Sequence, residues 1–79
     1  MKLNLLFFGG LVDVTGISQK ELVTDSLSDV ALLNKHLQSV FPLLIKHKYK
    51  IAVNQKVVEH SQTLQDGDEV AFLPPFAGG

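Results

Sequence analysis

The residues of this sequence best suited to chemistry lie at its end, which has the sequence Phe-Ala-Gly-Gly. Just before it, Pro74 and Pro75 have no backbone N–H and favour an extended course, so the chain leaves its last strand there. Residues 74–79, which we call the tail, span roughly 20 Å when extended. Glycine has no Cβ, so this end fits a narrow channel. We therefore expect the carboxylate of Gly79, with Gly78 beside it, to act inside a partner protein.

A carboxylate resists nucleophiles until it acquires a good leaving group, and ATP supplies one when an acyl-adenylate forms. The chain has no GxxxxGK[ST] loop that holds ATP, and Gly9-Gly10 lacks the flanking Lys and Ser or Thr of such a loop. We therefore expect no cofactor bound by this chain and a separate activating enzyme that uses ATP. Sulfur replacing AMP would turn the end into a thiocarboxylate, which suits a chain without cysteine.

Composition argues against several other classes of function. The net charge is -1 and all seven basic residues are lysines, so the concentrated basic face and arginine forks of nucleic-acid binders are missing. The apolar runs are much shorter than the ~20 residues that span a bilayer, and no signal segment is present, so we expect no membrane contact and a cytoplasmic location. His36, His47 and His60 are not spaced as metal ligands, and no metal site is expected.

Hydrophobic periodicity predicts the elements that must position the tail. Period-two patterns, with turns between them, predict strands at residues 2–8, 18–23, 49–53, 56–58 and 69–73. Apolar residues at three- and four-residue spacing predict one main helix, which begins after the expected N-cap Ser28 and ends at Pro42. A single helical turn is expected at residues 11–16, and the connector at 43–48 has no predicted structure.

The predicted order β-β-α-β-β-β, without a repeat or a linker, indicates a single α+β domain over residues 1–73, followed by the tail. In such a fold a mixed sheet wraps one main helix, and the first and last strands lie side by side at the centre. The sequence therefore predicts a ubiquitin-like β-grasp domain with a flexible C-terminal Gly-Gly tail.

Three segments resemble a known family: DGDEVAFLPPFAGG at residues 66–79, AVNQ at 52–55 and LFFG at 6–9. They closely resemble the small subunit of molybdopterin synthase, and the likeness covers essentially the whole chain. The resemblance implies that a ubiquitin-activating-type enzyme adenylates Gly79, which then carries a thiocarboxylate. It also implies a heterotetramer in which the large synthase subunit accepts the tail and sulfur passes to cyclic pyranopterin monophosphate during molybdenum cofactor biosynthesis. The chain would then be a carrier subunit and no enzyme by itself.

The docking surface of this family is an apolar area on the exposed face of the sheet. Strand alternation predicts that four apolar residues point outward, and the resemblance adds Val57 to them. We call these five residues the apolar patch: Leu6, Phe8, Val57, Ala71 and Leu73. The tail adds four further expected partner contacts: Pro74, Pro75, Phe76 and Ala77. Phe76 is bulkier than the small β-branched residue often found at this point in the family, which bears on the fit to a partner's channel.

Two charged groups allow more than one interpretation. The three lysines within residues 46–50 form either a solvated edge or a positive stripe that meets an acidic partner. Asp66, Asp68 and Glu69 either shape a turn or steer the tail toward a basic collar on the activating enzyme. Both alternatives depend on where the fold places these side chains.

Three other functions stay open at this point. The chain could carry sulfur for thiamine or another pathway, act as a ubiquitin-like modifier joined to lysines, or serve as a passive interaction module. The stretch Leu73-Pro74-Pro75 favours the molybdopterin family, because thiamine carriers usually lack a diproline there.

Overall fold

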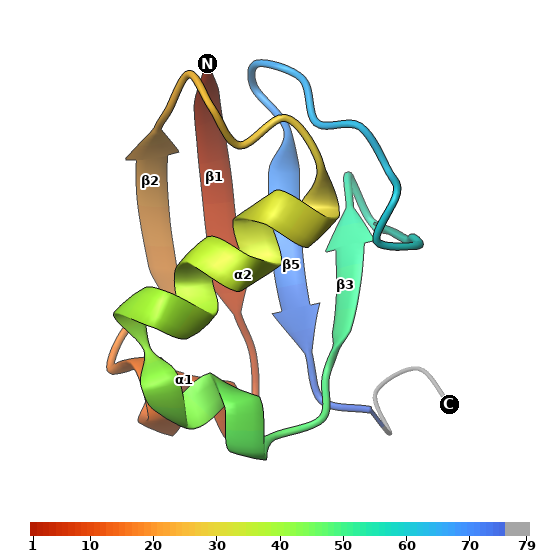
Figure 1. Cartoon of the computed structure of the whole chain (residues 1–79). Coiled ribbons are helices and arrows are strands. Elements are labelled where there is room, and N and C mark those ends of the chain that lie inside the picture. Colours follow the sequence, from red (N-terminus) through yellow and green to blue (C-terminus); the bar gives the residue numbers. More distant parts are fainter. Residues whose placement is uncertain (76–79) are drawn as a thin grey trace.

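The computed structural model describes residues 1–75, in which α2 crosses one face of a mixed sheet (Figure 1). The elements follow one another as β1 (Lys2–Phe7), α1 (Leu11–Thr15), β2 (Gln19–Val23), α2 (Val30–Val40), η1 (Pro42–Lys46), β3 (Lys50–Val53), β4 (Lys56–Val57) and β5 (Glu69–Leu73). The strand order is β2-β1-β5-β3-β4, with β1 and β5 parallel and the other pairs antiparallel. This arrangement confirms the predicted ubiquitin-like β-grasp fold, including the central pairing of the first and last strands.

The core lies between α2 and the inner face of the sheet. Val30, Leu33 and Leu37 are the buried residues of α2, at the three- and four-residue spacing seen in the sequence. The sheet contributes seven buried apolar side chains: Leu3, Leu5, Phe7, Ile51, Val53, Val70 and Phe72. Among them Phe7 and Phe72 stack across the central strand pair with ring centroids 5.0 Å apart. Because alternate residues of β1 and β5 fill the core, the residues between them face the other side of the sheet.

The N-cap of α2 is Asp29, so the prediction of Ser28 is wrong. The Asp29 side chain accepts a hydrogen bond from the Leu32 amide at 2.8 Å, and its charge interacts favourably with the helix dipole. The backbone of Ser28 has another role, because its carbonyl accepts a hydrogen bond from the Leu64 amide at 2.9 Å. The cap therefore lies one residue later than the sequence suggested.

The connector without a predicted structure is a 3-10 helix, η1. Its first residue is Pro42, which has no N–H and therefore cannot continue the hydrogen bonds of α2. At the first position of a helix no such donor is needed, so η1 can begin there. Leu44 is fully buried, whereas Leu43 and Ile45 on either side of it are 55% and 68% exposed. This short helix carries the chain back to β3, whose first residue lies opposite the last residue of β5.

Two tight turns close the other end of the sheet. Asn54 and Gln55 both have positive φ, +50° and +73°, which is the geometry of the turn between β3 and β4 that the sequence predicts. At the second turn, Asp66 accepts a hydrogen bond from the Lys2 amide at 2.7 Å, and the Gly67 amide donates to the Lys2 carbonyl at 2.7 Å. The turn before β5 is thereby bound to the start of β1.

Candidate functional site

The outer face of the sheet, opposite α2, carries a row of apolar residues that crosses four strands. Leu6 of β1 lies beside Ala71 of β5, Ala71 lies beside Ala52 of β3, and Ala52 lies beside Val57 of β4. Side chains of such paired neighbours point to the same face of a sheet. The strand pairing thus brings together three of the predicted patch residues, and it adds Ala52 to them.

A second row lies nearer the end of β5. Leu73 is paired with Lys50 of β3. Phe8 directly follows β1 and continues the parallel register of β1 with β5, so it lies beside Leu73. The Phe8 amide donates a hydrogen bond to the Phe72 carbonyl at 3.1 Å. Phe8 is 45% exposed and Leu73 is half-buried. The remaining two predicted patch residues therefore lie where the last strand ends and the tail begins.

Ala71 corrects the predicted patch in one respect. It faces outward, as alternation requires, but it is only 7% exposed, because its methyl group is short and is flanked by Leu6 and Ala52 on the neighbouring central strands. Ala71 is therefore part of the floor of the patch and offers a partner very little surface. Val57 differs from it, being 62% exposed on the short strand β4.

Ala52 is a patch residue that the sequence prediction missed. It is 4% exposed and, like Ala71, forms the floor of the patch. Strand alternation in the sequence could have identified Ala52. Ile51 and Val53 on either side of it are core residues, so the residue between them must point outward. Ala52 and Ala71 are adjacent on β3 and β5, so this part of the outer face carries only short side chains.

The root of the tail is held against the turn that follows β1. Gly9 has a φ of +59°, and a Cβ added to it would lie 2.7 Å from Cγ of Pro74, closer than real contacts allow. Pro74 is half-buried, and Pro75 is exposed. Because residue 9 is a glycine, the Pro74 ring can pack directly against the backbone of the turn after β1. This contact fixes the position of Pro74, the first residue of the tail. The predicted functional residues beyond that point, Phe76, Ala77, Gly78 and Gly79, lie outside the described residues, and their roles stay predictions.

The neighbouring glycines offer a matched test of this contact. We expect Gly9→Ala to lower the free energy of unfolding by about 1–2 kcal/mol, because alanine disfavours the left-handed conformation and its methyl group would displace Pro74. Gly10→Ala adds the same methyl group one residue later, at φ -63° and with nothing within 4 Å, and should change stability by less than about 0.5 kcal/mol. Urea unfolding of both variants measures the difference, and equal midpoints would contradict the role of Gly9.

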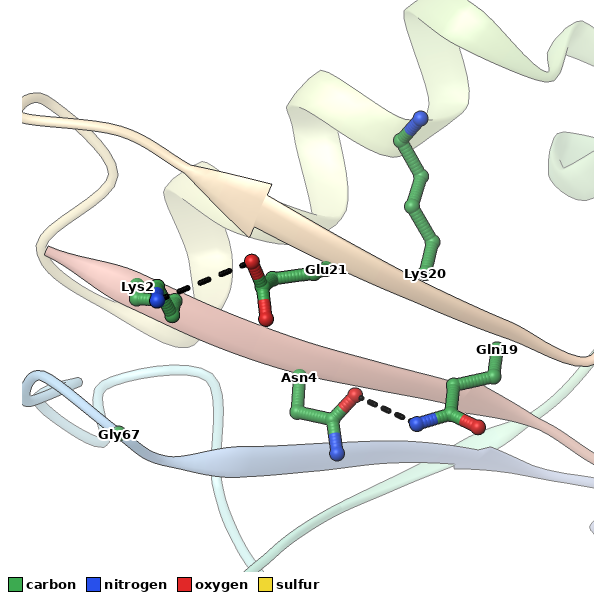
Figure 2. Close-up of a pocket in the computed structure, with 6 residues that line it drawn as sticks. All are labelled: Lys2, Asn4, Gln19, Lys20, Glu21 and Gly67. Carbon is green, nitrogen blue, oxygen red and sulfur yellow. Dashed lines mark hydrogen bonds and ion pairs between the residues drawn. The ribbon is translucent and has the colours of Figure 1, made fainter.

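A polar hollow of about 390 Å³ borders the apolar patch on the outer face (Figure 2). It is lined by Lys2, Asn4, Gln19, Lys20, Glu21 and Gly67. Lys2 and Glu21 form an ion pair at 3.8 Å, and Gln19 donates a hydrogen bond to Asn4 at 3.1 Å. Figure 2 shows Lys20 pointing away from these four side chains, in keeping with strand alternation. Because its polar groups pair with one another on an open surface, we regard the hollow as the polar border of the patch.

The steering role considered for Asp66, Asp68 and Glu69 does not fit the fold. They lie at the start of β5, and the tail begins at the opposite end of that strand. The carboxylate of Asp68 accepts hydrogen bonds from the Asn54 side chain and the Gln65 amide, each at 2.8 Å. The turn-forming interpretation is the one that the hydrogen bonds of Asp66 and Asp68 support.

Comparison with known proteins bears on the whole of this site. A family model described as the ThiS family matches residues 5–79 of the chain. The chain belongs to the ThiS family. The matched residues include the apolar patch, the floor alanines, the Gly9 turn and the tail, so the site assembled above lies within the ThiS family match.

Individual relatives of this ThiS family member agree with the resemblance seen in the sequence. A molybdopterin synthase sulfur carrier subunit from Mycobacterium tuberculosis is 39% identical, over 100% of this chain and 99% of the relative. Among solved structures, a Pyrococcus furiosus protein described as a molybdopterin converting factor subunit 1 has a TM-score of 0.87 at 21% identity, covering 95% of this chain and 98% of its own. One chain of a complex of subunits 1 and 2 of molybdopterin-converting factor from Helicobacter pylori has a TM-score of 0.71 at 26% identity, covering 100% of both chains.

Proposed function

We propose that this ThiS family member is the sulfur carrier subunit of a molybdopterin synthase, with the carboxylate of Gly79 carrying the sulfur. The observation that carries the proposal is the apolar patch, which continues along β5 to Leu73 at the root of the tail. A docking face joined directly to an end poor in side chains can deliver that end into a partner protein. The 39% identity to a molybdopterin synthase sulfur carrier subunit supports molybdopterin synthesis as the pathway.

The proposed chemistry uses the chain terminus and no side chain. In a ubiquitin-activating-type enzyme, a carboxylate oxygen of Gly79 attacks the α-phosphorus of ATP, which forms the acyl-adenylate and releases pyrophosphate. Sulfur at the oxidation level of sulfide then displaces AMP from the carbonyl carbon and leaves a thiocarboxylate. In the large synthase subunit the thiocarboxylate sulfur bonds to cyclic pyranopterin monophosphate, and water then cleaves the acyl–sulfur bond, which leaves the sulfur on the substrate and returns the terminus to a carboxylate. Each step needs a terminus that fits a narrow site, which a Gly-Gly end provides.

The large subunit is the partner for which the apolar patch is proposed. The complex of subunits 1 and 2 from Helicobacter pylori supports this choice, because its matching chain covers the full length of this one. We propose a heterotetramer, with two carriers and two large subunits, that works in the cytoplasm, where ATP is available. No helix among residues 1–75 is long and apolar enough to cross a membrane.

Mass spectrometry of the intact protein tests the proposal directly. Protein isolated from cells that make the molybdenum cofactor should contain a fraction whose mass is greater by the difference between sulfur and oxygen. Fragmentation should place this difference on Gly79 and show that the mature chain ends there. A mature chain that ends elsewhere, or a terminus that never carries sulfur while the cofactor is being made, would reject the proposal.

Two further measurements separate the proposed function from its alternatives. A thiamine-pathway carrier would also carry a thiocarboxylate, so the sulfur-loaded chain must be mixed with its large subunit and cyclic pyranopterin monophosphate. Formation of molybdopterin supports the proposed function, and no product from a loaded, bound chain favours another acceptor. A ubiquitin-like modifier would instead produce conjugates of high mass joined through lysine.

A further inference from the structure

The two ends of this domain differ in how their charged side chains are paired. Four carboxylates lie near the starts of β1 and β5. Asp66 accepts a hydrogen bond from the Lys2 amide, Asp68 and Glu69 precede and begin β5, and Asp25 lies 3.8 Å from the N-terminal amine. Because β1 and β5 run parallel, the tail leaves from the other end of the same two strands. Cations lie at the carboxylate end as well, because the N-terminal amine and Lys2 lie at the start of β1 and Lys56 is paired with Val53, so the charges there largely balance one another.

The end from which the tail leaves is rich in lysine. Lys46 is the last residue of η1, Lys50 is the first residue of β3, and Lys48 lies between them. We call these three residues the lysine cluster. All are exposed, and together they account for three of the seven basic residues of the chain.

The lysine cluster is adjacent to both parts of the proposed docking surface. Lys50 is paired with Leu73, so its side chain lies on the outer face at the border of the apolar patch. Lys48 lines a hollow of about 150 Å³ together with Pro74 and Pro75 at the root of the tail. The cluster therefore forms a positive border around the point where the tail begins, whereas the far border of the patch is the polar hollow of Figure 2.

The ion pairs within the described part of the domain do not involve the lysine cluster. The two found among residues 1–75 are those of the N-terminal amine with Asp25 and of Lys2 with Glu21. An interface whose apolar centre is surrounded by a charged rim is selective for partners of the opposite charge. The positive border is thus available to a partner that binds the patch.

We propose that the lysine cluster contacts an acidic rim around the opening through which the large synthase subunit accepts the tail. The inference rests on the proposed function, because it concerns the partner that receives Gly79. A protein fits better than a nucleic acid, because the cluster is continuous with the apolar patch and the chain has no arginine. Attraction between the lysine cluster and the acidic rim orients the approaching carrier with its tail toward the opening, which accelerates productive encounters at low salt.

A pair of charge reversals tests the proposal at constant net charge. Lys48→Glu with Lys50→Glu removes two cluster lysines, and Lys20→Glu with Lys35→Glu removes two exposed lysines of β2 and α2. Each double variant changes the net charge by -4. Stopped-flow mixing of the full-length chains with the cognate large subunit measures the association rate over a range of ionic strength. Circular dichroism first establishes that both variants unfold as cooperatively as the wild type.

We expect the cluster variant to associate about tenfold or more slowly than the control variant at low ionic strength, and the two rates to converge at high salt. Equal rates at low salt, with normal binding by the wild type, would overturn the acidic rim and leave the proposed function intact. A wild-type chain that does not bind the large subunit at all would reject both. Binding of single-stranded RNA that is lost in the cluster variant would assign the lysines to a nucleic acid and overturn the proposal as well.

Discussion

Deletion of Gly79 is expected to abolish molybdoenzyme activity while leaving the domain folded. The deletion shortens the reach of the terminal carboxylate by about 3.5 Å, and a misplacement of about 1 Å between reacting groups can already cost roughly a hundredfold in rate. The domain should stay folded, because the last core residue among residues 1–75 is Phe72. The measurement is the activity of a molybdenum-dependent enzyme in a strain that relies on the deleted form, with intact mass reporting whether sulfur is loaded.

Gly79→Ala is the matched control for this deletion. It keeps the length of the tail and its carboxylate, and it adds one methyl group where a narrow channel favours glycine. We expect partial activity from this variant and none from the deletion, which would show that the position of the carboxylate matters more than the identity of the last residue. Wild-type activity after deletion would contradict the role of Gly79, whatever the state of the apolar patch.

The fold was predictable because its main signals are local. Alternation of apolar and polar residues in β1 and β5 assigned Leu3, Leu5, Phe7, Val70 and Phe72 to the core, and all five are buried. The single amphipathic helix and the regular turns then left few arrangements for so short a chain. The β-grasp topology follows from this agreement between periodicity, turn chemistry and element order.

The errors arose where tertiary contacts decide the outcome. Ser28 and Asp29 are both good cap residues, and the hydrogen bond between the Ser28 carbonyl and the Leu64 amide, 36 positions away, shows what a local pattern leaves out. The exposure of Ala71 depends on its neighbours Leu6 and Ala52 on other strands, which alternation within one strand does not describe. The sequence predicted correctly that the Ala71 side chain points outward, but it did not predict how little of that side chain is exposed.

Spatial neighbours also decide which charged residues belong to the candidate site. Asp66 and Glu69 are closer in sequence to the tail than Lys48 is, yet β5 separates them from its root, whereas Lys48 lines the hollow beside Pro74. The contact between Gly9 and Pro74 joins residues 65 positions apart and was likewise beyond the sequence pattern. The tail was the most recognisable feature of the sequence, and the surface around its root required the fold.

Replacing Leu73 with glutamate is expected to weaken binding to the large subunit by about 2 kcal/mol or more, a factor of roughly thirty in affinity. Leu73 is half-buried in the row between Phe8 and Lys50 and directly precedes the diproline. A carboxylate there would lose its hydration when the partner covers the patch. Isothermal titration calorimetry measures the loss, after thermal unfolding has shown that the variant folds.

Val23→Glu is the matched control on the same sheet. Val23 is 70% exposed and paired with Lys2, at the end of the sheet farthest from the tail, so its replacement should change affinity by less than about 0.5 kcal/mol. In both variants the new carboxylate lies across from a lysine, because Val23 is paired with Lys2 and Leu73 is paired with Lys50. An exposed ion pair of this kind contributes only about 0–1 kcal/mol. A pairing with Lys50 therefore cannot offset the expected loss at Leu73. Equal affinities for the two variants would remove the apolar patch from the interface, even if sulfur transfer still requires Gly79.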